Sequence, residues 1–290
     1  MRTQTVPLRF LPFELGEPRS FHGLTILPLF SATRLQVEYV GLDEAVSRGL
    51  EVAEVDSAGA VQTLLVQNPL AERVLFYEGE ELAGAKQNRV LRGTVLVEAK
   101  TSLKIGVHCV ERGRWAFNSA HFAPAPWAAY PELRKAQRLG QGAVWAEVEA
   151  KQLRLHSYSP TEASEQLYVD HKHSLDEYLQ ALPRLDGQTG ALVGIAGRLV
   201  CLDFLSRSDV FAGLYLKLLR GYALSAIEHP VDKLLSKTAV GRFLGELELA
   251  ERTRRPAAGL GEEGELTEYA LGSELTVDGE VIALTAFPAR

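Results

Sequence analysis

Residues 74–115 read VLFYEGEELAGAKQNRVLRGTVLVEAKTSLKIGVHCVERGRW, and this stretch is the strongest indication of the fold. Two dense groups of polar residues stand out in it: the first motif, residues 78–89 (EGEELAGAKQNR), and the second motif, residues 109–115 (CVERGRW). Its apolar runs have the composition of buried strands: residues 74–77, 94–97 and 105–110. Strands that end in charged residues and glycines commonly carry a functional site on a rigid scaffold. The stretch therefore predicts a sheet with a site at the ends of its strands.

The residues before this stretch also favour β-structure. Residues 50–55 (LEVAEV) alternate as a strand does, and residues 61–66 form a second strand-like run. The sequence DSAG between them has turn composition, which predicts a hairpin. The chain is therefore expected to be dominated by strands as far as the second motif.

The pattern changes near Trp127, after which apolar residues recur at helical spacing. Pro131 and the segments SPTE (residues 159–162) and SLDE (residues 174–177) match the first turns of helices. Ser208 begins a long amphipathic segment, and a further helix is expected at residues 237–249. The middle of the chain is thus predicted to be helical.

Two hairpins and a loop are predicted toward the C-terminus. AGR at residues 196–198 and DG at residues 278–279 each separate strand-like runs. Residues 252–264 are charged and rich in Gly, which predicts a mobile loop. Strands first, helices in the middle and a final β-hairpin indicate an α+β fold rather than a regular βαβ alternation. We expect one large domain over residues 1–290, which could be subdivided into a β-rich part (1–126) and a helical part with closing strands (127–290).

The composition argues against several classes of protein. A formal net charge of −6 over 290 residues disfavours a general nucleic-acid coat. The longest apolar runs are shorter than the roughly 20 residues that span a bilayer, and the N-terminal MRTQTVPLRFLPF is not typical of a secretory signal. Cys109 and Cys201 each lie in an apolar run, which indicates buried reduced thiols and a cytoplasmic protein. No GxGxxG follows a predicted strand and no GxxxxGK[ST] occurs, so Rossmann-type and P-loop sites are disfavoured.

The carboxylates of the first motif can be interpreted in two ways. Glu78, Glu80 and Glu81 are close in sequence, and their charges repel unless Lys86, Arg89 or a metal ion compensates them. A metal held by carboxylates alone would be Mg²⁺ or Ca²⁺. Alternatively, the cluster is a solvated turn whose charge has no function.

The amides of the first motif also allow two interpretations. Gln87, Asn88 and Arg89 together suit a phosphate, a carboxylate or a ribose-like polyol, and Gly84 permits the close approach of a ligand. Alternatively, the amides satisfy the backbone of a turn. The sequence does not decide between these readings.

The second motif offers a carboxylate, a cation and a flat aromatic surface. Glu111, Arg114 and Trp115 fit a nucleobase or sugar pocket, although a cation packed on Trp115 for stability fits as well. We interpret Cys109 as a packed thiol rather than a nucleophile, because the adjacent carboxylate would raise its pKa. Asp203, inside a later apolar strand, requires a partner or a strand end and is either structural or part of the site.

The two motifs resemble those of the family named for its association with ADP-ribosylglycohydrolase (ARG) and rhodanese/phosphatase proteins. Further matching segments are QGAVW (residues 141–145), SPTEA (residues 159–163) and GLYLKLLRGYAL (residues 213–224), so the resemblance covers most of the chain. The family residues carried over are Glu80, Glu81, Gly84, Lys86, Gln87, Asn88, Arg89, Cys109, Glu111, Gly113, Arg114 and Trp115. Genomic association implies a link to ADP-ribose or nucleotide metabolism and gives no mechanism.

These expectations combine into a hypothesis of an enzyme, a hydrolase of ADP-ribose or a related phosphorylated nucleoside. The ligand would be bound by Lys86, Arg89 and Arg114 at phosphate, by Gln87 and Asn88 at hydroxyls, and by Trp115 through stacking. Glu81 or Glu111 would be the general base, Lys86 a further catalytic group, and Glu80 would help to hold Mg²⁺.

Two alternatives belong to other classes of protein. The chain could be a sensor that binds ADP-ribose or a nucleotide without turnover, or a structural or interaction protein whose motifs are salt-bridged cores. Neither nucleic acid nor a membrane is expected as a partner. If the motifs form one site, they should lie close together, with Glu80 or Glu81 near Lys86, Arg89 or Arg114.

Overall fold

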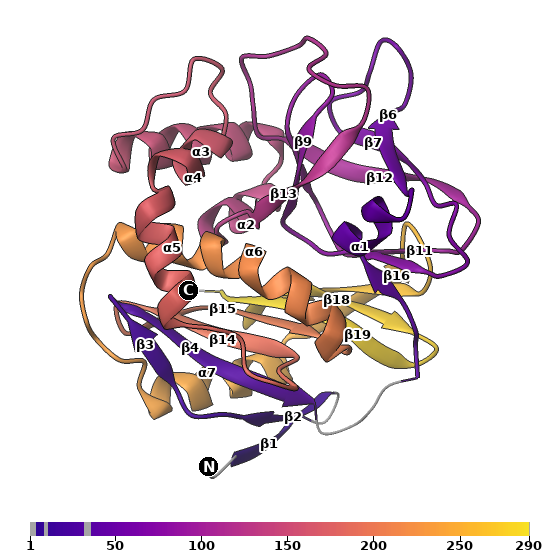
Figure 1. Ribbon diagram of the computed structural model, residues 1–290. Coiled ribbons are helices and arrows are strands. Elements are labelled where there is room, and N and C mark those ends of the chain that lie inside the picture. The colour runs from indigo at the N-terminus through magenta and orange to yellow at the C-terminus, as the bar shows by residue number, and fades with distance from the viewer. Residues whose placement is uncertain (1–3, 9–10, 32–35, 290) are drawn as a thin grey trace. The chain divides into compact units, whose positions relative to one another are not determined.

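The computed structural model describes residues 4–8, 11–31 and 36–289 and has the predicted α+β fold (Figure 1). The chain divides into two compact units: unit 1 is Met1–Val37, Asp176–Ala257 and Gly261–Arg290, and unit 2 is Glu38–Leu175 and Ala258–Leu260. The subdivision considered at residue 127 does not coincide with a unit boundary, because this residue lies in strand β13 (Phe122–Ala128), within unit 2. The units are set by strand pairing between distant segments, which a change in local periodicity does not reveal.

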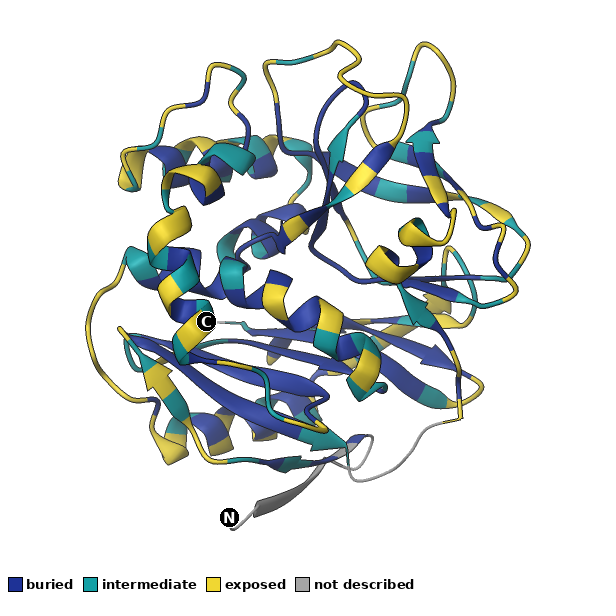
Figure 2. Cartoon of the chain, viewed as in Figure 1, coloured by how far each residue is buried: buried dark blue, intermediate teal, exposed yellow. Residues whose placement is uncertain are grey.

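Unit 1 is built on one antiparallel sheet with the order β1-β2-β4-β14-β15-β19-β18-β17-β16, and with β3 paired to β4. The strands are β1 (Gln4–Leu8), β2 (Leu11–Leu15), β3 (Arg19–Phe21), β4 (Leu24–Ser31), β14 (Gly190–Ile195), β15 (Arg198–Leu205), β16 (Glu251–Pro256), β17 (Glu262–Thr267), β18 (Ala270–Val277) and β19 (Glu280–Pro288). Its central strands are buried along their length, as the dark blue ribbons in Figure 2 show.

Two helices cover the faces of this sheet (Figure 1). Helix α6 (Ser208–Ile227) packs against β4, β14 and β15, and helix α7 (Lys237–Leu249) packs on the opposite face with Phe243 and Leu247 in the core. By length and composition alone α6 could cross a membrane, although Lys217 and Arg220 interrupt its apolar residues. The helix is mostly buried, however, as is typical of an apolar helix in the core of a folded domain.

The turns of unit 1 follow the sequence in two places and depart from it in a third. At the β14–β15 turn Ala196 and Gly197 have φ of 48° and 74°, and at the β18–β19 turn Asp278 and Gly279 have φ of 52° and 83°, so both hairpins are confirmed. The mobile loop predicted at residues 252–264 is wrong, because most of it forms the paired strands β16 and β17. Strand β16 lies at the sheet edge and is almost wholly exposed. Charged side chains are tolerated on such an edge strand, although their density in the sequence predicted a loop.

Unit 2 holds a six-stranded sheet with the order β13-β9-β10-β12-β7-β6 and a three-stranded sheet with the order β11-β8-β5. Its strands are β5 (Val40–Gly41), β6 (Glu51–Glu54), β7 (Thr63–Gln67), β8 (Val74–Phe76), β9 (Glu80–Gly84), β10 (Arg89–Leu91), β11 (Val95–Val97), β12 (Ser102–Cys109) and β13 (Phe122–Ala128). Its helices are α1 (Leu42–Ser47), α2 (Pro131–Gln137), α3 (Gln141–Arg154) and α4 (Glu165–Asp170), and α5 (Lys172–Ala181) crosses the boundary to unit 1. The three strands predicted within residues 74–115 are β8, β11 and β12. The segment SPTE precedes α4 as a turn instead of opening a helix.

The six-stranded sheet is curled, since its edge strands β13 and β6 contact each other. Its inner face is apolar and carries Val52, Leu64, Ile105, Leu91 and Leu82. Directly paired residues of antiparallel strands point to the same face of a sheet. Strand register therefore decides which motif residues enter the inner face.

Candidate functional site

Strand register places Arg89 and Glu81 of the first motif on opposite faces of the curled sheet. Arg89 pairs with Leu82 on one side and with Cys109 on the other, so these three side chains share the inner face. Glu81 pairs with Val90, one residue further along β10, and therefore shares the outer face. The predicted site is thus divided by the sheet itself.

The loops that carry the two motifs nevertheless lie side by side. The backbone N–H of Asn88 donates to Glu111 Oε2 at 3.0 Å, and the Val110 N–H donates to the Asn88 carbonyl at 3.1 Å. The carboxylate that pairs with Arg114 is that of Glu111, with 2.6 Å between Nη2 and Oε2. No ion pair within 4 Å joins Glu81 to a cation in the part of the chain that the structure describes.

Arg114 and Glu111 act as a clamp between the loops. Arg114 donates to both carboxylate oxygens of Glu111, to the carbonyls of Gly84, Ala85 and Ala116, and to Asn88 Oδ1. Burial would raise the pKa of Glu111, but hydrogen bonds from Arg114, the Asn88 backbone and Thr161 outweigh it and hold this pKa below its usual value. Arg114, one of the cations that the hypothesis assigned to phosphate, and both oxygens of Glu111, one of the two candidate bases, are therefore engaged within the protein.

The other polar residues of the β9–β10 turn also bond within the protein. Asn88 Oδ1 accepts from the Gly84 N–H at 3.0 Å, and its Nδ2 donates to Glu165 at 2.9 Å. Gly84 has a φ of 119°, and a Cβ there would lie 2.4 Å from Ser119 Oγ, so this glycine admits the neighbouring loop. Gln87 Oε1 accepts from Arg89 Nη1 at 2.9 Å. The interpretation of the amides as turn-stabilising groups fits this geometry.

Arg89 is the exception, because part of its guanidinium has no partner. The side chain is 0% exposed, and its Nε and Nη2 have no hydrogen-bond acceptor among residues 4–8, 11–31 and 36–289. Burial lowers its pKa, although the nearby Cys109 and Glu54 counteract this. Glu54 Oε1 lies 3.7 Å from Nη2, and Glu54 Oε2, also buried, lacks a partner within the same described residues.

Glu54 was missed by the sequence analysis, although a signal for it exists. It is the last residue of β6 and the fifth residue of the segment LEVAEV (residues 50–55), in which Val52 faces the core, and the period of two places Glu54 on the same inner face. A carboxylate at an inward position of a strand requires a cation or a ligand. Here the cation is Arg89, from a strand that is distant in sequence.

Lys86 and Trp115 lie over this buried pair. Lys86 Nζ donates to the carbonyls of Ser57 and Ala58 at 2.7 and 2.6 Å and is 5.1 Å from the centre of the Trp115 ring. The Arg89 Cζ atom is 5.7 Å from the same centre. Trp115 is 47% exposed, so part of its indole is accessible to solvent, and both cations lie close to its ring.

Glu81 occupies a different environment on the outer face. Its Oε2 accepts from Trp127 Nε1 at 3.0 Å and from Ser164 Oγ at 2.9 Å, while Oε1 is buried without a hydrogen-bond partner among the described residues. Burial, opposed by these two bonds, raises the pKa of Glu81 to about 7. Trp127 stacks on Tyr168 at 4.8 Å. The pKa of this carboxyl therefore lies near neutral pH, but its strand position places it on the opposite face of the sheet from Arg89.

The remaining predicted groups are buried and packed. Glu80 Oε2 accepts from the Tyr77 N–H at 2.9 Å. Cys109 is 0% exposed, and burial raises the pKa of its thiol, as expected for a packed cysteine. No group of three or more His, Cys, Asp or Glu side chains suited to a metal ion occurs in the described part of the chain. In unit 1, Asp203 accepts from Tyr222 at 2.5 Å and from Thr285 at 3.1 Å, which explains a carboxylate within a core strand.

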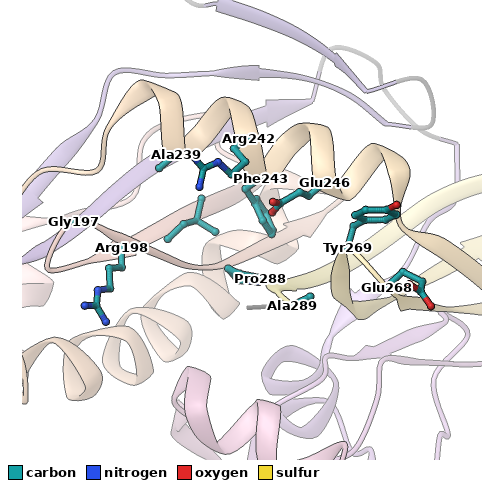
Figure 3. Close-up of a pocket in the computed structure, with 11 residues that line it drawn as sticks. Gly197, Arg198, Ala239, Arg242, Phe243, Glu246, Glu268, Tyr269, Pro288 and Ala289 are labelled. Atoms are coloured by element: carbon teal, nitrogen blue, oxygen red, sulfur yellow. The ribbon is translucent and has the colours of Figure 1, made fainter.

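A surface cavity of about 780 Å³ lies in unit 1 and contains none of the predicted site residues (Figure 3). It is lined from α7, from the β14–β15 and β17–β18 turns and from the end of β19 by Gly197, Arg198, Leu199, Ala239, Arg242, Phe243, Glu246, Glu268, Tyr269, Pro288 and Ala289. Its charged residues are exposed or half-buried, and they carry both signs. We place the candidate site at Arg89 and Trp115 instead, because that region has buried polar atoms without partners.

Comparison with known families agrees with the sequence of the two motifs. A family model described as the ARG and Rhodanese-Phosphatase-superfamily-associated Protein domain, ARPP-1, matches residues 12–287. The chain belongs to the ARPP-1 family. No curated protein and no solved structure gives a significant match. The ARPP-1 assignment confirms the resemblance carried by the motifs, and its description names an association and no reaction.

Proposed function

We propose that this ARPP-1 domain binds ADP-ribose or a related phosphorylated nucleoside on the exposed face of Trp115. The observation that carries the proposal is a half-exposed indole with the cations of Lys86 and Arg89 close to its ring. An aromatic surface stacks on a nucleobase, and the adjacent cations attract phosphate. The clamp formed by Arg114 and Glu111 holds the loop of Trp115 close to the β9–β10 turn, which favours a preformed binding surface.

Binding without turnover is the part of the hypothesis that the geometry supports best. Glu111 already accepts four hydrogen bonds, from Arg114, Asn88 and Thr161, and Glu81 lies on the other face of the sheet from Arg89. Hydrolysis is the second candidate function, because Glu81 has a pKa of about 7 and an oxygen without a partner among the described residues.

A stacking variant tests the binding proposal. Isothermal titration calorimetry with ADP-ribose, AMP and adenosine should show binding of at least one phosphorylated ligand and weaker binding of adenosine. Trp115→Ala should weaken that binding by about 5- to 150-fold, since a base stacked on an aromatic ring contributes about 1–3 kcal/mol. Tyr269→Ala is the matched control, because Tyr269 is similarly exposed, at 53%, and lies in unit 1.

Binding that survives Trp115→Ala unchanged would refute the placement of the ligand. If none of the three ligands binds at millimolar concentration, the structural or interaction alternative takes its place. For turnover, bound ADP-ribose followed by ³¹P NMR with and without Mg²⁺ should stay intact if the domain is a sensor. If it is hydrolysed, Glu81→Gln should keep binding and lower the rate about 10²-fold or more.

A further inference from the structure

The inner face of the curled sheet holds a cation and a carboxylate that are only partly paired with each other. Arg89 is 0% exposed and Glu54 is 8% exposed. Arg89 Nε and Nη2 and Glu54 Oε2 have no hydrogen-bond partner in the described parts of the chain. A buried donor or acceptor without a partner is costly, so three at one place indicate that something polar binds between them.

The orientation of the free atoms suggests what they bind. Arg89 Nη1 is held by Gln87 Oε1 at 2.9 Å, which fixes the guanidinium and leaves the edge formed by Nε and Nη2. This edge carries two parallel N–H groups that match two oxygens of a carboxylate or phosphate. Glu54 Oε2, when ionised, can only accept a hydrogen bond. The ligand therefore needs two oxygens for Arg89 and an O–H for Glu54.

We propose that Arg89 and Glu54, with Lys86, form a site for a singly protonated phosphate monoester, whose oxygens accept from Arg89 and whose P–OH donates to Glu54. The inference rests on the proposed function and narrows it. A phosphate monoester, as in AMP, carries a P–OH in its monoanionic form. In ADP-ribose each phosphate of the bridge is bonded to one ester oxygen and to the bridging anhydride oxygen, and has no P–OH at neutral pH. The nucleoside would stack on Trp115 while its phosphate reaches Arg89.

The local charges agree with a monoanion. Lys86 and Arg89 contribute two positive charges and Glu54 one negative charge, which leaves a net charge of one positive. The other cation near Arg89, Arg114, is neutralised by Glu111 at 2.6 Å. Cys109, the remaining titratable neighbour of Arg89, is a neutral thiol because burial raises its pKa. A dianion would place its second charge beside the Glu54 carboxylate, which opposes binding.

Discrimination between phosphate and sulfate tests this proposal on the full chain. At pH 6, calorimetry with inorganic phosphate should show binding at least about tenfold tighter than that of sulfate at equal ionic strength, because sulfate has no proton for Glu54. Phosphate binding should weaken from pH 6 to pH 8 as the dianion replaces the monoanion. Glu54→Gln should abolish the preference, since the amide can donate to either anion.

Two further variants complete the experiment. Arg89→Lys should weaken the binding of both anions, because an ammonium lacks the two parallel donors. Glu263→Gln is the matched control, since Glu263 pairs with Arg255 at 3.2 Å on the exposed surface of unit 1. If Arg89→Lys does not fold, the phosphate-to-sulfate ratio of Glu54→Gln decides the question, because loss of stability alone does not reverse a preference between two anions.

Equal affinity for phosphate and sulfate in the parent chain, binding of neither, or a preference that survives Glu54→Gln would overturn the inference. The proposed function can fail separately. A phosphate preference without any binding of AMP or ADP-ribose would support the anion site and refute nucleoside recognition. ADP-ribose binding that is lost in Trp115→Ala but unchanged in Glu54→Gln and Arg89→Lys would support the proposed function and refute the anion site.

Discussion

Replacement of Arg114 by Ala should destabilise unit 2 even without any ligand. Arg114 joins the two motifs through both oxygens of Glu111, the carbonyls of Gly84 and Ala85, and Asn88 Oδ1. The sequence alone suggested a contact to phosphate for this residue, so a loss of stability would separate the two interpretations.

The expected magnitude follows from the burial of the pair. The side chains of Arg114 and Glu111 are 16% and 7% exposed, and removal of one partner from a buried ion pair costs about 3–5 kcal/mol. Glu111 keeps its bonds from the Asn88 N–H and Thr161 Oγ1, so we expect the lower end, about 3 kcal/mol. Arg112→Ala is the control from the same motif: Arg112 and Glu162 are 55% and 54% exposed and 3.8 Å apart, which predicts less than about 1 kcal/mol.

Urea unfolding followed by tryptophan fluorescence measures this difference. All three tryptophans, at positions 115, 127 and 145, lie in unit 2, so the signal reports on that unit. The hydrogen bonds described above lower the pKa of folded Glu111, so its contribution is present above the unfolded pKa of about 4.3 and is lost as the pH falls through the lower folded value. The difference in unfolding free energy between the parent and Arg114→Ala should therefore decrease at acidic pH. A loss of less than 1 kcal/mol at neutral pH, or equal losses in both variants, would refute the clamp.

Three further predictions concern stability. Burial raises the pKa of Glu81 to about 7, so the stability associated with its protonated form is complete below about pH 4 and is lost as the pH rises through 7. Between pH 4 and pH 8 the unfolding free energy of Glu81→Gln should therefore rise by roughly 3 kcal/mol relative to that of the parent. Unfolding free energies that change in parallel with pH in the two proteins would contradict this prediction. Gly84→Ala should lower the free energy of unfolding in urea by about 2 kcal/mol or more, because Gly84 has a φ of 119° and an added Cβ would lie 2.4 Å from Ser119 Oγ. Gly142→Ala in α3 should be neutral or stabilising, because nothing lies within 4 Å of an added Cβ there. Asp203→Ala should lower the unfolding free energy of unit 1 by about 2–3 kcal/mol in calorimetry, because it removes the hydrogen bonds that the hydroxyls of Tyr222 and Thr285 donate to Asp203. An unchanged unfolding transition would show that these hydrogen bonds contribute little to stability.

Local sequence determined the elements of this fold well. The alternation of LEVAEV and the turn residues at 196–198 and 278–279 correspond to the observed β6, β14–β15 and β18–β19. These features depend on side-chain period and on backbone angles of single residues, both of which are encoded within a few positions. The family resemblance likewise rests on contiguous motifs, and the ARPP-1 match over residues 12–287 confirms it.

Tertiary structure alone decided how the residues of the motifs are used. A difference of one position in the pairing of β9 with β10 separates Arg89, on the inner face, from Glu81, on the outer face, and the composition of the motif does not fix that register. The partner of Arg89 proved to be Glu54, from a strand that neither motif contains. Density of charge in a sequence shows where polar groups gather, but only the folded chain shows which of them satisfy one another, as Arg114 and Glu111 do, and which keep atoms free for a ligand, as Arg89 and Glu54 do.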